Sequence, residues 1–295
     1  MGTSPLTILV TGSSSGFGRL TSETLARRGH RVFASMRDAD GRNAPAAAEL
    51  ANLADREDLP LTVLDLDVRD DDSVTAAVES AVAVGGRLDV LVNNAGTSYL
   101  GLLETLTVDQ ARDLFETNVF SMLRMNRAVL PHMRARGSGL LVHISSGLGR
   151  IVLPFNGLYT ATKFAVEAIA ETYRYELACV GVDSVIVEPG VYATSFFENA
   201  AANRAADAQR ATDYGPLYRL SQDMAARRPA PGDPQEVADA IAELVELPAG
   251  TWPLRTTVGW SAQRADPVNE VAAELQRTVF DGTGMLDVVT LAPQR

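Results

Sequence analysis

Short apolar runs separated by helix-like segments recur along almost the whole of this 295-residue chain. Runs that are apolar throughout are typical of strands buried on both faces of a parallel sheet. They lie at Leu6–Thr11, Arg31–Met36, Leu61–Leu66, Leu88–Val92, Leu140–Ser145, Asp183–Val187 and Thr256–Val258. Apolar residues at helical spacing occupy Gly18–Arg28, Ser73–Val84, Val108–Arg136, Leu158–Val180 and Gln235–Leu247. This alternation predicts an α/β fold, a doubly wound parallel sheet of about seven strands with helices on both faces.

One segment interrupts the alternation. Residues 190–234 separate the sixth predicted strand from the next helix, and connections longer than about 15 residues are usually functional or disordered. We predict a lid over a substrate site here, within a single domain over residues 1–265. The alanine-rich stretch Ser195–Arg210 has little to anchor it, which predicts that it orders when ligands bind. Residues 266–295 form a helical extension that could complete the core or cover a neighbouring subunit.

The composition limits what such a chain binds. The formal net charge of -11 argues against nucleic acid, because phosphate binding requires a basic surface. The only cysteine, Cys179, excludes an internal disulfide, and its apolar surroundings predict a buried side chain. His30, His132 and His143 lack metal-like spacing, so we predict no metal site. No apolar run reaches the roughly 18 residues that span a membrane, and the first strand leaves no room for a signal peptide. We expect a soluble, cytoplasmic protein.

Lys163 is the single lysine among the 26 lysine and arginine residues. It follows Tyr159 by four residues, so the two side chains lie on one face of a helix. An ammonium is a compact point charge and a guanidinium is a planar fork, so a site that keeps lysine in this chain indicates that the two are not interchangeable there. A nearby cation lowers the pKa of tyrosine from its usual value of about 10. The pair predicts a tyrosine tuned for proton transfer near neutral pH; a helix surface that carries both by chance is the alternative.

A glycine-rich turn follows the first predicted strand. The segment Thr11–Gly18 reads TGSSSGFG and leads into the first helix. Glycines let backbone amides approach a pyrophosphate at the positive end of a helix. A plain strand-to-helix turn is the alternative interpretation. We predict that the turn binds a dinucleotide through Gly12, Ser13, Ser14, Ser15, Gly16, Phe17 and Gly18.

Four motifs together resemble the short-chain dehydrogenase/reductase (SDR) family. They are the glycine turn, Asn93-Asn94-Ala95-Gly96, Ser145-Ser146, and Tyr159 with Lys163. The likeness covers about residues 5–195. Arg31–Asp38 and Leu148–Lys163 are most similar to the branch that acts on steroids, retinoids and related lipophilic alcohols. The resemblance implies that residues 1–265 form a Rossmann-like dinucleotide-binding catalytic domain, and we expect a homodimer or homotetramer.

The resemblance also implies catalytic roles. Tyr159 would be the general acid/base, and Lys163 would lower its pKa and hydrogen-bond the nicotinamide ribose. Ser146 would donate to the substrate oxygen as charge develops there. Ser145 is the rival for this role, but the spacing of thirteen residues before the tyrosine favours Ser146. Asn118 would help to hold a water in a proton relay, and its alternative is an ordinary polar helix residue.

Further cofactor contacts follow from the same resemblance. They comprise Asp67 and Val68 beside the adenine, Asn94, Ala95 and Gly96 beside the adenosine ribose, Tyr159 and Lys163, and Pro189, Gly190, Val191 and Thr194 beside the nicotinamide.

The end of the second strand bears on the choice between the two nicotinamide cofactors. An acid at this point binds the ribose 2′-hydroxyl of NAD, whereas an arginine accommodates the 2′-phosphate of NADP. Met36 stands where NAD-preferring relatives tend to carry an acid, and Arg37 follows it. Asp38 could turn inward and favour NAD instead. The sequence therefore predicts NADP, with NAD as the alternative.

These motifs predict an oxidoreductase that transfers hydride between NADP(H) and a lipophilic secondary alcohol or its ketone. A non-catalytic NAD(P)-sensing protein would need no proton donor. A nucleotide-sugar epimerase or dehydratase usually has a different glycine spacing and a larger C-terminal domain. The predicted substrate contacts are Ser146, Leu148, Leu153, Phe155, Tyr159, Tyr192, Phe196 and Phe197.

Overall fold

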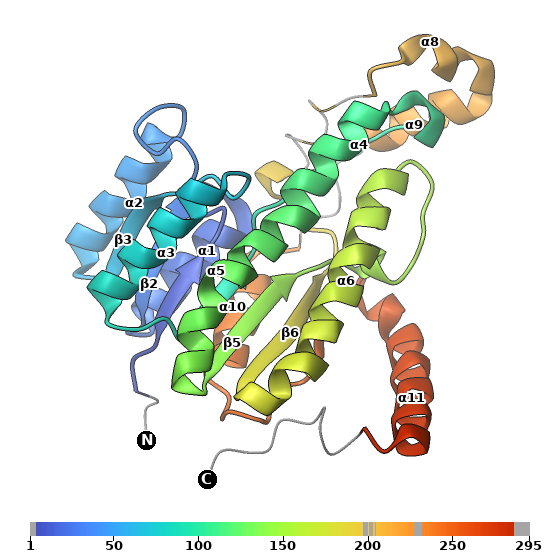
Figure 1. Cartoon of the computed structure of the whole chain (residues 1–295). Coiled ribbons are helices and arrows are strands. Elements are labelled where there is room, and N and C mark those ends of the chain that lie inside the picture. The colour runs from blue at the N-terminus through green and yellow to red at the C-terminus, as the bar shows by residue number, and fades with distance from the viewer. Residues whose placement is uncertain (1–3, 197–199, 201–202, 204, 227–231, 286–295) are drawn as a thin grey trace.

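The computed structural model describes residues 4–196, 200, 203, 205–226 and 232–285. Within these residues, seven parallel strands form one sheet in the order β3-β2-β1-β4-β5-β6-β7. The strands are β1 (Thr7–Val10), β2 (Arg31–Met36), β3 (Leu61–Asp65), β4 (Val90–Asn93), β5 (Gly139–Ile144), β6 (Val182–Pro189) and β7 (Arg255–Val258). The chain builds outward from β1 on one side and from β4 on the other, so the sheet is doubly wound (Figure 1). The predicted fold class is confirmed, and the strand ends differ from the prediction by at most two residues.

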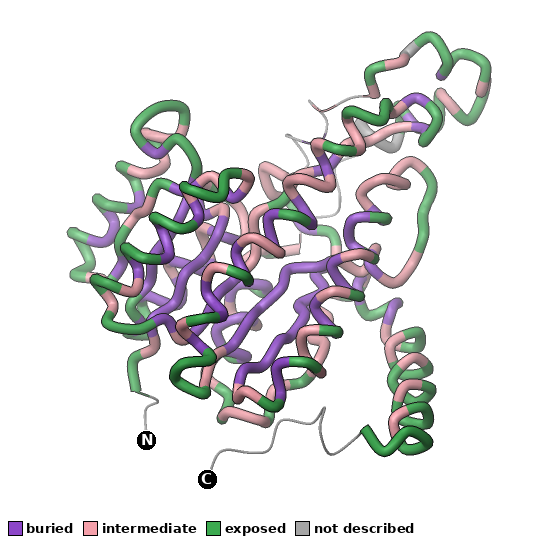
Figure 2. Tube along the Cα trace, in the orientation of Figure 1, coloured by how far each residue is buried: buried purple, intermediate pink, exposed green. Residues whose placement is uncertain are grey.

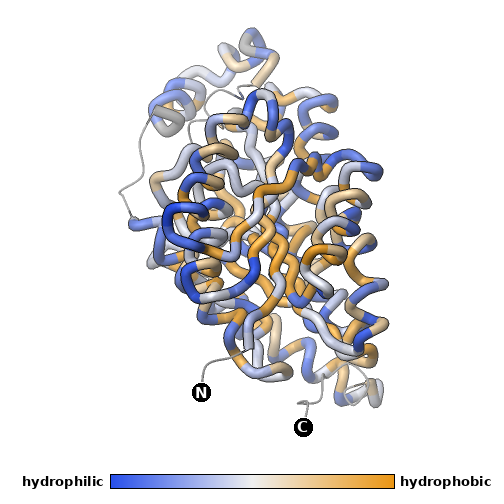
Figure 3. Tube along the Cα trace, turned by 90° about the vertical axis from the view of Figure 1, so that its left-hand side faces the viewer, coloured by the Kyte–Doolittle hydropathy of each residue, from blue (hydrophilic) through white to orange (hydrophobic). Residues whose placement is uncertain are grey.

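Helices cover both faces of this sheet. One face carries α1 (Gly16–Arg27), α2 (Ala44–Glu57) and α10 (Gln235–Val245), and the other carries α3 (Asp71–Gly85), α5 (Ser121–Arg136) and α6 (Gly157–Leu177). In β2, Val32 and Ala34 belong to one apolar core and Phe33 to the other. The inner strands β2, β1, β4, β5 and β6 are buried along most of their length (Figure 2), whereas the edge strands β3 and β7 are mostly not buried. Apolar residues gather along the strands between two helical layers (Figure 3). Burial on both faces explains why the inner strands are largely apolar.

The long helix predicted over residues 108–136 is one continuous helical run with an irregular turn inside it. It comprises α4 (Val108–Phe115), the π-helical turn η2 (Glu116–Phe120) and α5. Thr107 and Gln110 cap its start reciprocally. A π-helical turn inside an α-helix is frequent at functional sites, and here it contains Asn118.

The apolar pattern predicts no element over residues 44–57, yet this segment forms α2. The helix follows Asn43, with proline in its first turn. Its pattern is weak because few of its residues face the core, namely Leu50, Leu53 and Ala54.

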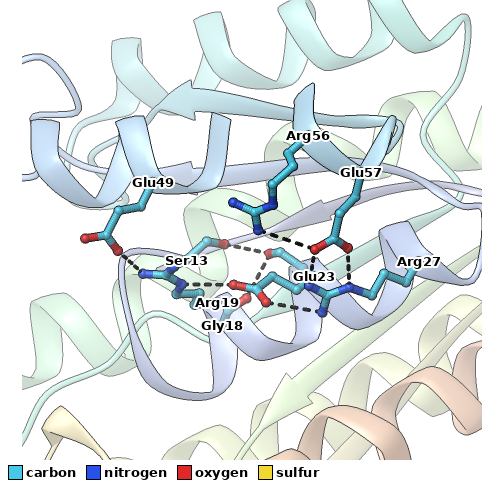
Figure 4. A network of polar contacts seen from close by, with 9 residues as sticks. Ser13, Gly18, Arg19, Glu23, Arg27, Glu49, Arg56 and Glu57 are labelled. Atoms are coloured by element: carbon cyan, nitrogen blue, oxygen red, sulfur yellow. Dashed lines mark hydrogen bonds and ion pairs between the residues drawn. The ribbon is translucent and has the colours of Figure 1, made fainter. Parts of the chain in front are cut away.

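Ion pairs join α2 to α1 behind the glycine turn (Figure 4). Arg19 pairs with Glu49 at 2.6 Å, and Arg27 pairs with Glu57 at 2.8 Å. Glu23 contacts both arginines from within α1. Each pair is partly exposed and contributes less than about 1 kcal/mol. Burial of apolar side chains therefore holds α2 more than these charges do.

The segment between β6 and α10 extends past the end of α4 (Figure 1). Its regular elements include α8 (Ala208–Ala211), η5 (Thr212–Tyr214) and α9 (Pro216–Ala226). Asn203 donates to Thr97 Oγ1 at 3.1 Å, and both Arg210 and Tyr214 contact Glu104. The expectation that Ser195–Arg210 has little to anchor it is therefore wrong, because side chains in its second half bind the region after β4.

The C-terminal helix α11 (Asp266–Thr283) leaves the body of the protein (Figure 1) and has no buried residue. Its contacts include a hydrogen bond from Asn269 to Glu188 at 2.9 Å and an edge contact between the Phe280 and Tyr175 rings. The apolar positions at helical spacing are exposed, at Val268, Val271, Leu275 and Val279. Of the two roles expected for this extension, completion of the core is therefore wrong.

Cys179 is exposed, which contradicts the prediction of a buried thiol. It lies in η4 (Ala178–Val180), a 3-10 turn that continues α6 to the surface. Among the residues described, no helix combines the length and the apolar character that crossing a membrane requires.

Gly18 lies where α1 presses against the glycine turn. A Cβ atom at this position would overlap the carbonyl oxygen of Gly12 and the side-chain amide of Asn94. The glycine therefore permits the close contact between the first helix and the ends of two strands.

We predict that Gly18→Ala lowers the free energy of unfolding by about 1–3 kcal/mol, the usual cost of overpacking. Gly282→Ala in α11 is the matched control, because no atom lies within 4 Å of the added methyl group. The control is expected to be neutral or stabilising by up to about 1 kcal/mol. Urea denaturation measures both variants, and an unchanged midpoint for Gly18→Ala would contradict the steric argument.

Candidate active site

The glycine turn and the loop after β4 are joined at the point where the strand order reverses. The Asn94 amide donates to the carbonyl oxygens of Thr11 at 2.9 Å and Gly12 at 3.2 Å. In return, Thr11 Oγ1 accepts from the backbone N–H groups of Asn94 and Ala95, each at 3.0 Å. Gly12 has a φ of 72°, in the left-handed region that favours glycine. The Asn94 side chain thus shapes the turn, and a direct contact of this amide with a cofactor stays a prediction.

The serines of the turn face in different directions. Ser13 is buried, with its hydroxyl 3.1 Å from the Val10 carbonyl and 3.0 Å from Ser22 Oγ. Ser14 is partly exposed and Ser15 is exposed. Ser15 precedes the first turn of α1 without a side-chain cap, so the first amides of the helix keep their capacity to bind an anion. This arrangement fits the phosphates of a dinucleotide.

Tyr192 does not line the substrate side, contrary to the prediction. Its side chain is 2% exposed and packs edge-on against Phe17, with ring centroids 5.7 Å apart. Its hydroxyl donates to Glu236 Oε2 at 2.9 Å. The aromatic residue therefore belongs to the apolar core between the turn and α10.

The segment that follows β6 lies against the glycine turn. Ser195 donates to Ser15 Oγ at 2.8 Å, and Thr194 lies beside Gly16. The backbone N–H of Val191 donates to Ser261 Oγ at 2.9 Å, in the loop after β7. Sequence reasoning missed Ser195 and Ser261, because no spacing signal connects these two serines with the turn. Of the residues predicted to contact the nicotinamide, Thr194 thus lies beside the turn, whereas Gly190 and Val191 lie against the loop after β7.

Ser146, Tyr159 and Lys163 are brought together at the carboxyl end of β5. Ser146 follows this strand, whereas the other two lie in the first turns of α6. The hydroxyl of Ser146 forms a hydrogen bond with Tyr159. Lys163 is buried, with its ammonium 5.6 Å from the centre of the Tyr159 ring and 2.8 Å from the carbonyl oxygen of Ile144.

Burial distinguishes the two neighbouring serines. Ser145 is 3% exposed, and its hydroxyl has no hydrogen-bond partner among the residues described. Ser146 is partly exposed and contacts Tyr159. The geometry therefore favours Ser146, as the spacing does.

Asn118 is fixed in the π-helical turn. Its Oδ1 accepts from the backbone N–H of Thr97 at 2.9 Å, and its Nδ2 donates to Thr97 O at 2.9 Å and Thr162 Oγ1 at 3.0 Å. Together with Lys163 it lines a cavity of about 10 Å³. That volume is close to the minimum that one water requires, so the cavity fits the predicted relay.

The electrostatics of the free protein differ from the expectation of a tyrosine tuned to neutral pH. Burial raises the pKa of Tyr159 to about 12, although the hydrogen bond with Ser146 acts in the opposite direction. Burial also lowers the pKa of Lys163 to about 8, an effect that Glu167 opposes. Desolvation is the largest cause of both pKa shifts. At neutral pH both side chains keep their protons.

Arg37 is exposed at the end of β2, and no other side chain in the described part of the chain forms an ion pair with it. Met36 is buried, so it presents no polar group at the surface. Asp38 has a φ of 52°, and its carboxylate accepts from the backbone N–H of Arg42 at 2.7 Å. The acid therefore closes a local turn and leaves the arginine open.

The two residues predicted beside the adenine follow β3. Asp67 Oδ1 accepts from the backbone N–H of Arg69 at 2.9 Å, and Val68 is 9% exposed. These contacts shape a surface at the same edge of the sheet as the glycine turn.

Of the remaining predicted substrate residues, Phe196 lies against Tyr159, with ring centroids 5.6 Å apart. Leu153 is 49% exposed, and Leu148 and Phe155 are partly exposed. A contact of these three residues with a substrate stays a prediction. Phe197 lies outside the described residues.

The sequence profile of the short chain dehydrogenase family matches residues 6–205. This range includes the glycine turn, Asn118, Ser146, Tyr159 and Lys163. The chain belongs to the short-chain dehydrogenase family. It is an oxidoreductase by family, and the similarity to the branch acting on steroids and retinoids is confirmed by its relatives.

Two curated relatives and one solved structure show the similarity of this short-chain dehydrogenase in detail. It is 37% identical to human 17-beta-hydroxysteroid dehydrogenase type 1, over 85% of this chain and 77% of that protein. It is 32% identical to 3-ketodihydrosphingosine reductase of Bacteroides thetaiotaomicron, over 86% of this chain and 88% of that protein. The crystal structure of a short-chain dehydrogenase from Streptomyces avermitilis superposes with a TM-score of 0.76 at 32% identity, covering 96% of this chain and 98% of that one.

Lys163→Arg is predicted to fold normally but to lose activity by a factor of at least about 100, the scale of acid–base catalysis. Within the described residues the buried ammonium donates to one acceptor, the Ile144 carbonyl, whereas a guanidinium brings five N–H donors on a wide plane into the same space. Lys163→Met is the matched control without charge. Wild-type turnover in the arginine variant, with loss in the methionine variant, would show that any cation suffices.

Proposed function

We propose that this short-chain dehydrogenase transfers hydride between NADP(H) and a lipophilic secondary alcohol or its ketone, with Tyr159 as general acid/base. The observation that carries the proposal is the grouping of Ser146, Tyr159 and Lys163 beside the glycine turn. Asn118 reaches the same group through a shared cavity. A protein that only senses the cofactor would need no such grouping.

The side chains have complementary tasks in this proposal. A bound nicotinamide dinucleotide supplies or accepts the hydride. Tyr159, protonated at neutral pH because its pKa is about 12, donates a proton to the oxygen of a ketone. Ser146 donates a hydrogen bond to the same oxygen as negative charge develops. Lys163 and Asn118 hold the water through which the phenol regains its proton.

A preference for NADP is supported by the end of β2. Arg37 is exposed and free of ion pairs within the described residues, so it can meet a 2′-phosphate. The neighbouring acid, Asp38, is held by Arg42 and does not compete. Cofactor contacts by Asp67, Val68 and Asn94 remain part of the proposal.

A lipophilic substrate is supported by the surroundings of Tyr159 and by the relatives. Phe196 presents apolar surface beside the Tyr159 ring, and Leu153 in the loop before α6 is exposed. The curated relatives are named for steroid, retinol and ketosphingosine substrates. Burial of apolar surface stabilises a bound ligand by about 25 cal/mol per Å². A large apolar alcohol is therefore expected to bind beside Tyr159 more tightly than a polar one.

The segment 190–234 is proposed as the substrate lid of the domain over residues 1–265. It leaves the sheet beside Tyr159 and is anchored at its far side to Glu104 and Thr97. A homo-oligomer is also part of this proposal, because α11 carries an exposed apolar stripe.

Tyr159→Phe is expected to lower ketone reduction by a factor of at least about 100, because the ring remains but the proton donor is lost. NADPH binding should persist, as measured by titration of its fluorescence. Tyr173→Phe, on the same helix, is the matched control and should keep its turnover. The assay is NADPH oxidation with a panel of apolar ketones. Absence of turnover in the wild type, with NADPH still bound, would instead indicate a sensor.

Arg37→Ala should weaken NADPH binding by about 10-fold to 100-fold, the range for loss of a charge-assisted hydrogen bond. NADH binding should not change, since NADH has no 2′-phosphate. Arg31→Ala, at the opposite end of the same strand, is the control. Calorimetric titration of both cofactors measures the effect, and tighter binding of NADH than NADPH to the wild type would overturn the preference.

A further inference from the structure

A buried cluster of charges lies one helical turn beyond Lys163. Arg255 on β7 contacts three carboxylates, Glu167 at 2.9 Å, Glu171 at 2.5 Å and Glu188 at 3.4 Å. The four side chains are at most 10% exposed. One guanidinium cannot neutralise three carboxylates, so the cluster tends to hold excess negative charge inside the protein.

Two of the three carboxylates, Glu188 and Glu171, are stabilised by protonation or by further hydrogen bonds. Burial, and then the charge of Glu167, raises the pKa of Glu188 to about 7, so near neutrality it binds a proton part of the time. Glu188 also accepts from Asn269 at 2.9 Å. Glu171 stays ionised, because hydrogen bonds from Tyr175 and Arg255 hold its pKa below the usual range against the effect of burial.

Glu167 differs from both of these acids. It follows Lys163 by four residues, so the two lie on one face of α6. Its Oε2 accepts from Arg255, but its buried Oε1 has no hydrogen-bond partner in the part of the chain that the structure describes. Oε1 faces Gly149, where a Cβ atom would come within 3.1 Å of it. Half of this carboxylate is therefore not satisfied by the arginine.

Within the described residues, no carboxylate forms an ion pair with Lys163 on the preceding turn. Lys163 is 7% exposed, and its ammonium donates to a neutral acceptor, the Ile144 carbonyl. Burial of an ammonium favours loss of its proton. Glu167 is the acid whose charge counteracts this loss. The attraction acts across one turn of helix, without a direct ion pair between the two side chains.

We propose that Glu167, held by Arg255, is a positioning residue for the reaction, whose carboxylate stabilises the buried ammonium of Lys163 beside Tyr159. The inference rests on the proposed function, because it assigns the residue an effect on the lysine of the proposed catalytic group. The buried pair of Glu167 and Arg255 extends that group from α6 to β7 at the edge of the sheet.

Other ionisable groups around this pair come from several elements. They are Tyr159 and Glu171 on α6, Glu188 on β6, Arg255 on β7, and Arg150 in the loop after β5, which acts on Glu188. Of the acids in the cluster, Glu167 lies one helical turn from Lys163, and Glu171 lies two turns away. Replacement of Glu167 is therefore expected to have a larger effect on Lys163 than replacement of Glu171.

The chain allows a direct measurement, because Lys163 is its only lysine. Labelling with ¹⁵N-lysine gives one side-chain amine signal, whose pH titration in the cofactor-free protein reports the pKa of this residue. Glu167→Gln should lower the midpoint from about 8 by about one pH unit, the scale for loss of a nearby opposite charge. Glu171→Gln removes a partner of the same arginine and is the matched control, expected to shift the midpoint by less than half as much.

Activity provides the second measurement. If turnover requires the ammonium, the high-pH limb of ketone reduction should move to lower pH in Glu167→Gln by the same amount as the lysine midpoint. Glu167→Asp, which keeps the charge, should restore most of the shift in both measurements. If Glu167→Gln does not fold, Glu167→Ala gives the same test, because Arg255 keeps Glu171 and Glu188.

The outcomes separate this inference from the proposed function. An unchanged lysine midpoint in a folded variant of an active enzyme overturns the inference alone. A shifted midpoint with an unchanged pH profile shows that Glu167 affects the lysine but not the reaction, and overturns the positioning role. A wild type without turnover overturns the proposed function, and the positioning role with it, whatever the lysine midpoint does.

Discussion

The close contact between the glycine turn and the loop after β4 sets the geometry of the whole site. Gly18 lets α1 approach the turn, and the Asn94 amide binds the carbonyl oxygens of Thr11 and Gly12. Strands β1 and β4 are neighbours at the point where the strand order reverses. In open α/β sheets, ligands bind beside this point, at the carboxyl ends of the strands. A dinucleotide site and the tyrosine group can then share one edge.

Burial governs the chemistry available at that edge. The sequence motif predicts a cation that lowers the pKa of Tyr159, yet in the free protein desolvation raises this pKa to about 12 and lowers that of Lys163 to about 8. A tyrosine that keeps its proton is suited to donate it, which in the proposed reaction favours reduction of a ketone. Under the same proposal, alcohol oxidation requires removal of that proton, which becomes easier as the pH rises.

The site could be predicted well where its residues lie close together in sequence or follow strands in order. Tyr159 and Lys163 are four residues apart on one helix, and Ser146 follows a buried strand. Contacts between distant segments left no such signal. Ser195 on Ser15, for example, joins residues far apart in the chain, and only the folded protein brings them together.

Several corrections share one physical cause. Tyr192 was expected beside the substrate and Cys179 in the core, but the first is buried and the second exposed. Apolar or aromatic character indicates that a residue can be buried, not which surface covers it. The stripe on α11 illustrates the same point, because helical periodicity predicted the helix but not the absence of a covering layer.

The amino-acid sequence by itself determined the succession of the seven strands along the chain, most of the helices between them, the family, and the residues at the carboxyl ends of the strands, because these depend on local periodicity and short spacings. Tertiary structure alone decided that Tyr192 is buried, how Asp38 is held, and that Arg255 meets three carboxylates. Those outcomes depend on burial and on contacts between distant elements, and the free energies of charged groups change most where water is excluded.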